Sequence, residues 1–173
     1  MTAKQIIQKI DKEGERWLTL PLYAMVVLTV CIEVFRRSLL SYSSIWAEEV
    51  ARYAFIYIAW IGASSAIRER AHIRIDVILP LLSNRWKSIV FIFSDIVTLI
   101  LAVLALYWSM EPVINSIHFG SVTHGLRISH AWFLFAVPLG FSMMTVRLIQ
   151  SMKRDISDLR AGRPVFEGNK LFD

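Results

Sequence analysis

The stretch SIVFIFSDIVTLILAVLALYWSM, residues 88–110, decides the fold of this chain. Asp95 is its only charged residue, and leucine, isoleucine, valine and phenylalanine dominate the rest. A helix that crosses the hydrocarbon core of a bilayer needs roughly 17 to 25 mostly apolar residues, and this stretch has that length. It therefore predicts a transmembrane helix.

Three further stretches meet the same length and polarity criteria, at residues 17–35, 50–67 and 131–149. Hydrophobic residues make up 55% of the chain and charged residues 19%, whereas soluble domains average about 45–50% and about 25%. We therefore predict an all-α integral membrane protein that forms a single membrane domain over residues 1–173, with four transmembrane helices. Residues 150–173 are expected to form a cytoplasmic helical extension and tail.

The distribution of basic residues predicts the orientation in the membrane. Most of the 19 Lys and Arg residues precede the first span, lie between the second and third, or follow the fourth. The other two connections hold Arg36, Arg37, Arg52 and Arg127. By the positive-inside rule both termini are expected in the cytoplasm. The net charge of +5 and the pI near 9.6 fit this asymmetry and anionic membrane lipids as partners, so they do not call for nucleic acid.

The segment that leads into the second span is rich in charge. Ser44 is placed to cap the helix, and Glu48 and Glu49 fall where the helix dipole favours negative charge. Glu48 and Arg52 are spaced as an i, i+4 ion pair. Two interpretations stay open: a well-capped helix at the interface, or an acid pair that engages a partner subunit.

Small residues mark one face of the second span. Ala59, Gly62, Ala63 and Ala66 recur at helical spacing, which lets the backbone of another helix approach closely. The pattern predicts a packing face, either within the bundle or against a partner.

The connection after the second span runs through Arg68, His72 and Asp76 to a short apolar segment at residues 77–82. This pattern predicts a loop followed by a short interfacial segment that lies on the membrane between the second and third helices. His72 and Asp76 are spaced to hydrogen-bond if helical, and we interpret them as a structural tether rather than a proton-transfer pair.

Several classes of chemistry are not supported. Cys31 is the only cysteine, which excludes an internal disulfide and Cys-rich metal sites. The four histidines are not spaced as metal ligands, and no phosphate-binding loop, zinc-protease helix or nucleophile elbow is present. We therefore predict no metal, no cofactor and no enzymatic activity.

Acidic residues in the spans lie near the ends rather than at the midplane. Glu33 and Glu111 fall toward the outer side, and Asp95 toward the inner side. A complete ion-coupled transporter is expected to carry a polar site near the bilayer centre. The chain is therefore predicted not to be a complete transporter.

An ordered set of residues between Trp46 and Asp76 resembles the small (Q-type) membrane subunit of tripartite ATP-independent periplasmic (TRAP) transporters. The set comprises the segment WAEEVAR at residues 46–52, the small residues that follow, and HIRID at residues 72–76. The similarity implies a subunit-interface motif made of Trp46, Glu48, Glu49, Arg52, Gly62, Ala63, Ala66, Arg68, His72 and Asp76.

The resemblance implies a multi-pass protein of the bacterial inner membrane that is an accessory scaffold rather than a carrier. Its partners would be a large multi-span membrane subunit and a periplasmic substrate-binding protein that docks from outside. The transporter would import an organic acid with sodium, of the sialic acid or C4-dicarboxylate class, with the overall pattern closer to the sialic acid type.

Arg36 and Arg37 lie at the outer end of the first span, on the side that is poor in cations. They fit either snorkelling to lipid phosphates or docking of the binding protein through surface charge. The alternatives to the scaffold function are a stand-alone oligomeric ion or drug transporter that uses Glu33 as its coupling carboxylate, and a membrane enzyme or cytochrome subunit.

Overall fold

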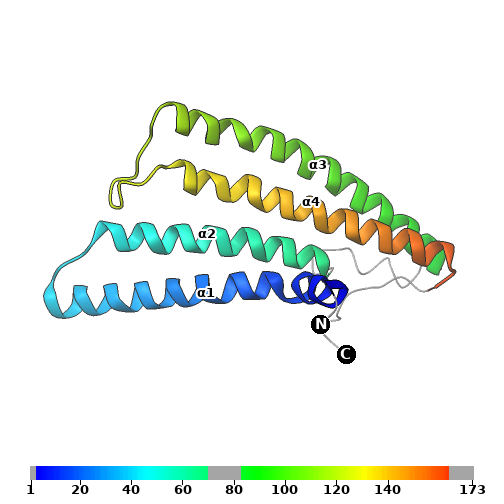
Figure 1. Cartoon of the computed structure of the whole chain (residues 1–173), viewed down its shortest axis with the longest axis horizontal. Helices are drawn as coiled ribbons and strands as arrows, with labels where there is room; N and C mark the ends of the chain where they lie inside the picture. The colour runs from blue at the N-terminus through cyan, green and yellow to red at the C-terminus, as the bar shows by residue number, and fades with distance from the viewer. Residues whose placement is uncertain (1–2, 70–82, 164–173) are drawn as a thin grey trace.

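A computed structural model describes residues 3–69 and 83–163, which form four long helices (Figure 1). The helices are α1 (Ala3–Leu40), α2 (Ile45–Arg68), α3 (Asn84–His118) and α4 (Ala131–Arg160). Each contains a segment long and apolar enough to cross a membrane, and no strand forms within the described ranges. The prediction of an all-α fold with four membrane-spanning helices is confirmed.

The helices extend beyond the hydropathic spans. The helix α2 begins at Ile45, five residues before its predicted span, and α3 continues past Met110 to His118. Hydropathy marks only the part of a helix that suits hydrocarbon, whereas backbone hydrogen bonding continues through polar turns. The interfacial segment predicted at residues 77–82 lies outside the described residues.

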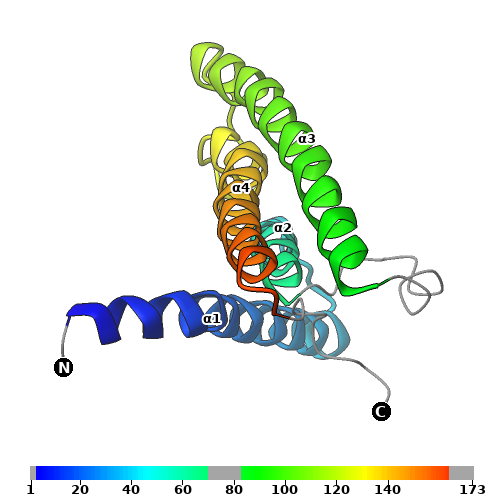
Figure 2. The same ribbon diagram turned by 90° about the vertical axis from the view of Figure 1, so that its right-hand side faces the viewer.

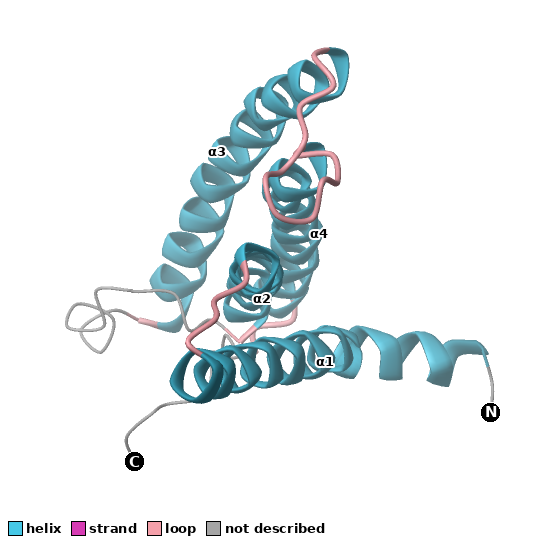
Figure 3. Ribbon diagram, turned by 90° about the vertical axis from the view of Figure 1, so that its left-hand side faces the viewer, coloured by secondary structure: helices cyan, strands magenta, loops and turns pink. Residues whose placement is uncertain are grey.

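The helices pack in the order α1, α2, α4, α3, as Figures 1 and 3 show. The α1–α2 and α3–α4 connections lie at one end of the bundle, called the outer end here because it is predicted to face the periplasm. The start of α1 and the end of α4 lie at the opposite, inner end. This agrees with two termini on one side of the membrane; which side that is stays a prediction.

Among the described residues, the helix α1 contacts the bundle mainly along a narrow seam with α2. Figure 2 shows it at one edge of the molecule, with its first turns extending past the other helices. From Glu15 onward, the residues of α1 that are not exposed follow alternating steps of four and three, which is coiled-coil spacing. They are Glu15, Thr19, Leu22, Val26, Thr29, Glu33 and Arg36.

A glycine determines how closely α2 and α4 approach. A Cβ atom added at Gly140 would lie 2.5 Å from Cε3 of Trp60. The indole of Trp60 also packs against Phe141, with ring centroids 4.8 Å apart. Near this contact Ile67, Ala102 and Leu148 form the small buried core that joins α2, α3 and α4.

Candidate functional site

At the outer end, Glu49 fastens the α3–α4 loop to α2. Its Oε1 accepts the backbone N–H of Gly125 and its Oε2 that of Leu126, both at 2.9 Å. Hydrogen bonds to a carboxylate are stronger than those between neutral groups. Gly125 packs directly on α2, since a Cβ there would lie 2.9 Å from Cα of Trp46. Trp46 and Glu49 thus hold a loop of their own chain.

Two other charged residues in the first turns of α2, Glu48 and Arg52, do not hold the α3–α4 loop. Glu48 and Arg52 are exposed, and no ion pair joins them, so the predicted i, i+4 pair is wrong. The helix dipole favours Glu48 in the first turn and water solvates the exposed Arg52, so a surface ion pair would add little.

The α1–α2 turn is held by Glu33. The backbone N–H of Ser44 donates to Oε1 of Glu33 at 2.8 Å, and the Ser44 hydroxyl donates to Oε2 at 2.7 Å. The expected side-chain cap by Ser44 is therefore absent, because its hydroxyl is directed at Glu33 instead of its own helix. Glu33 is consequently a structural group at a turn, which does not favour it as a coupling carboxylate.

Arg36 and Arg37 have different environments although they are adjacent. Arg36 donates from Nη1 to Oγ of Ser44 at 3.2 Å and lies over the ring of Tyr42, with its Cζ 5.1 Å from the centroid. Arg37 is exposed and makes no hydrogen bond or ion pair within the described ranges. Arg36 therefore belongs to the turn, and Arg37 presents its charge to the outside.

The small-residue face of α2 is left largely uncovered by the described helices. Ala59 and Gly62 are exposed, and a Cβ added at Gly62 would meet nothing within 4 Å. Ala63 and Ala66 are half-buried. This face is thus available for contact with another membrane helix.

At the inner end, a buried ionic cluster joins three helices, and sequence reasoning missed it. Nε of Arg147 on α4 lies 2.8 Å from Oε1 of Glu15 on α1, and these side chains are only 10% and 6% exposed. The hydroxyl of Ser64 donates to the same oxygen at 3.3 Å, and Nη1 of Arg68 lies 3.9 Å from Oε2. Matching opposite charges at equal depth in different spans was the signal that could have found it.

Of the predicted motif, Arg68 therefore reaches the ionic cluster, whereas His72 and Asp76 lie outside the described residues. Within the described ranges, no group of three or more His, Cys, Asp or Glu side chains is arranged to hold a metal.

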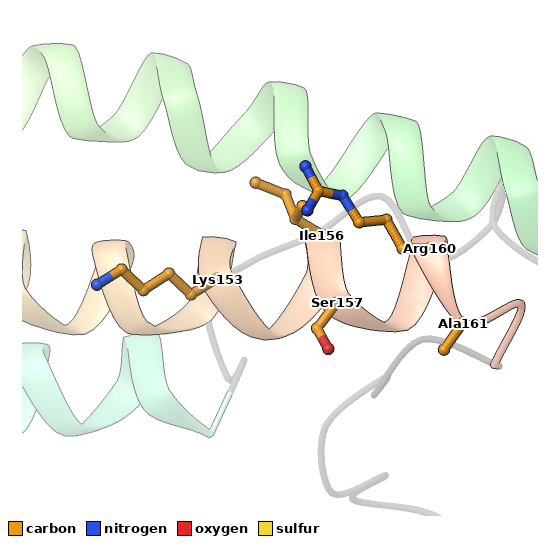
Figure 4. Close-up of a pocket in the computed structure, with 5 residues that line it drawn as sticks. All are labelled: Lys153, Ile156, Ser157, Arg160 and Ala161. Carbon is orange, nitrogen blue, oxygen red and sulfur yellow. The ribbon is translucent and has the colours of Figure 1, made fainter.

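Two surface cavities lie at opposite ends of the bundle. The inner one, of about 510 Å³, runs along the last turns of α4. Figure 4 shows Ile156 and Arg160 extending from one side of α4, and Ser157 and Ala161 from the other. The outer one, of about 430 Å³, lies between α2 and the α3–α4 loop.

Comparison with known proteins places this geometry in a family. Residues 26–158, most of the chain, match the family described as tripartite ATP-independent periplasmic transporters, DctQ component. The chain is 24% identical over 148 residues to the sialic acid TRAP transporter small permease protein SiaQ of Vibrio cholerae, a match that covers 86% of this chain and 84% of the relative.

Two longer relatives also match. The isethionate TRAP transporter permease protein DctMQ of Oleidesulfovibrio alaskensis is 30% identical over 110 residues, covering 64% of this chain and 17% of the relative. The sialic acid TRAP transporter permease protein SiaT of Haemophilus influenzae is 25% identical over 137 residues, covering 79% and 22%. The chain thus spans about a fifth of the length of these two. It belongs to the DctQ family and is a TRAP transporter small permease subunit, a multi-pass protein of the inner membrane.

Proposed function

We propose that this chain is the accessory scaffold of a sodium-coupled, binding-protein-dependent importer of an organic acid. It stabilises a large multi-span membrane subunit that carries both substrate and sodium. The small subunit contributes ligands to neither.

The commitment of Glu15, Glu33 and Glu49 to structural contacts carries this proposal. Glu33 holds the α1–α2 turn and Glu49 holds the α3–α4 loop, each through both carboxylate oxygens. Glu15 is occupied by Arg147 at the inner end. A transport site requires polar groups near the midplane, whereas these carboxylates lie toward the ends of their helices. The arrangement suits a rigid support.

The exposed small-residue face of α2 favours the proposal that a large membrane subunit packs against this chain. Small residues allow close backbone approach, which is a main source of helix association in lipid. Two relatives contain the matched segment within much longer permease proteins, which favours a large permease as the neighbour. We propose that the partner packs on Ala59, Gly62, Ala63 and Ala66, with Glu48 at the outer end of the contact.

Copurification tests this interface and the function together. When the chain is coexpressed with the large permease of its gene neighbourhood and solubilised mildly, the two are expected in one-to-one ratio. Ala59→Leu should reduce the recovered permease about tenfold, because about 1.4 kcal/mol of lost packing gives that factor.

Ala24→Leu is the matched control, since Ala24 is an exposed alanine on α1. It should leave copurification unchanged. Loss of the partner with Ala24→Leu and not with Ala59→Leu would move the interface to α1. A stable homo-oligomer that excludes the permease would contradict the scaffold function itself.

The substrate class is proposed from the relatives. Their names specify sialic acid and isethionate, both of which are organic anions. We propose a carboxylate of the sialic acid or C4-dicarboxylate class for this system. Proteoliposomes that contain both membrane subunits, supplied with the binding protein and a sodium gradient, should accumulate labelled sialic acid or a C4-dicarboxylate. Uptake that is independent of sodium would contradict the coupling.

Arg37 is proposed to dock the binding protein. Arg37→Glu should lower uptake about tenfold, because reversing a charge at an interface slows association and replaces attraction with repulsion. The two membrane subunits should still copurify, since Arg37 is exposed and makes no hydrogen bond or ion pair within the described ranges.

Lys153→Glu is the matched control for Arg37→Glu, because Lys153 is an exposed cation at the inner end. Its uptake should equal that of the unmodified protein. Equal uptake by both variants would discard Arg37 as a docking residue and leave it the role of a lipid contact.

A further inference from the structure

The outer cavity brings together groups of both charges. The helix α2 and the α3–α4 loop line its volume of about 430 Å³ with Glu49, Arg52, Tyr53, Thr123, His124 and His130. Glu49 and Arg52 are three residues apart on one helix, which places their Cβ atoms about 5–6 Å apart. An anionic and a cationic group thus face one space at short separation.

The position of the cavity along the bundle matches the headgroup layer. The hydroxyl of Tyr57 donates to the backbone oxygen of Trp132 at 2.7 Å, so this level of α2 lies beside the first turn of α4. Arg52 is five residues closer to the outer end, about 7.5 Å farther along the helix. Trp46 and Trp132 are 45% and 63% exposed around this level, as expected of interfacial tryptophans.

The donors in the cavity suit a phosphate. Arg52 is exposed and has no ion pair within the described ranges, and its guanidinium presents a planar set of N–H donors. His124 and His130 line the same space from the α3–α4 loop. A neutral imidazole donates one N–H, so α2 and the loop both offer donors to phosphate oxygens.

The acceptor in the cavity suits an ammonium. A carboxylate offers about four lone-pair sites, and the two backbone N–H bonds of Glu49 use only part of them. Its negative charge disfavours a purely anionic occupant, such as a phosphatidylglycerol headgroup or an acidic side chain. A group that carries a phosphate and an ammonium a few ångströms apart fits both sides.

We propose that this cavity binds the headgroup of an ethanolamine phospholipid. The phosphodiester lies at Arg52, beside the loop histidines, and the primary ammonium lies at Glu49. The two-carbon ethanolamine arm spans the separation between the two charged side chains. This site stands independently of the scaffold function, because it needs only the isolated chain.

The test uses the purified chain in mild detergent, titrated with phosphatidylethanolamine, phosphatidylglycerol or phosphatidylcholine of identical acyl chains. Thermal unfolding and native mass spectrometry give binding and stabilisation. Phosphatidylethanolamine should raise the Tm most, because phosphatidylglycerol lacks the ammonium and phosphatidylcholine cannot donate hydrogen bonds from its quaternary nitrogen. Arg52→Gln should reduce the affinity for phosphatidylethanolamine about tenfold.

Arg127→Gln is the control, because Arg127 is an exposed arginine at the same end that does not line the cavity. It should bind phosphatidylethanolamine as the unmodified chain does. Equal responses to all three lipids, a preference for phosphatidylglycerol, or an unchanged response in Arg52→Gln would each overturn the proposal. So would an Arg52→Gln variant that binds lipid normally but no longer binds the purified periplasmic binding protein.

Discussion

Glu15→Ala is expected to destabilise the isolated chain by about 3–5 kcal/mol, because it leaves a buried arginine without its carboxylate. Arg147 is 10% exposed and lies 2.8 Å from Glu15 in the native chain. The helix α1 has only one other contact surface, its seam with α2, so its inner half should loosen as well. The free energy of unfolding measured in mixed detergent micelles, together with hydrogen exchange of α1, would check this.

A double-mutant cycle separates the buried charge from general damage. Glu15→Ala combined with Arg147→Ala should be less destabilised than the sum of the single variants, because neither charge remains buried alone. Glu48→Ala, which removes an exposed carboxylate without an ion pair, should change stability by less than about 0.5 kcal/mol. Additive single effects would refute the coupling between α1 and α4.

Gly140→Val is expected to separate α2 from α4 and to destabilise the chain by about 1–3 kcal/mol, as overpacking of a filled contact does. The added Cβ alone would lie 2.5 Å from the Trp60 ring, which is itself packed against Phe141. The emission of Trp60, isolated by replacing the other tryptophans with phenylalanine, should shift as the indole moves. Thermal unfolding gives the loss of stability.

Gly62→Val is the matched control, because Gly62 is also a helical glycine but its Cβ position is open. Its unfolding should be unchanged or slightly more difficult, since replacing a helical glycine reduces the entropy of the unfolded chain. Trp60→Ala should rescue Gly140→Val by removing the ring from the occupied space. Equal effects of the two valine substitutions would show that helix propensity, not the Trp60 contact, sets the result.

The four helices could be predicted from local sequence, because the hydropathy of about 20 consecutive residues indicates whether a segment lies in lipid or in water. Residues 88–110 need no knowledge of any neighbour to be identified as a span. The ends of the helices depend on polar turns that hydropathy does not weigh. For this reason α2 starts at Ile45 instead of Val50, and its early turns are free to hold the α3–α4 loop.

The contacts between helices could not be predicted in the same way. Glu15 and Arg147 are 132 residues apart, and each has a satisfactory local explanation as a charged residue near a span end. Trp60 lies deep in the second span, and nothing near it in sequence points to Gly140. Such pairings depend on the rotation and order of the helices, which the apolar pattern of each span leaves open.

The motif at residues 46–52 illustrates what the sequence could predict and what it could not. Its residues were selected through a family resemblance, and the family is confirmed. Glu49 nevertheless acts within the chain, through Gly125 and Leu126. Arg52 lines the outer cavity. A sequence pattern can thus identify important positions without showing what they contact.

The ionic link between the first and last helices has a consequence for biogenesis. The α1–α2 hairpin can close as soon as Ser44 emerges from the ribosome and meets Glu33. Glu15 must wait until α4 is made, since Arg147 lies near the end of the chain. Until then, Ser64 and Arg68 of α2 are the groups of the cluster in place to contact its carboxylate. A truncated or stalled chain therefore holds α1 against α2 alone, without the charge pair that ties α1 to α4.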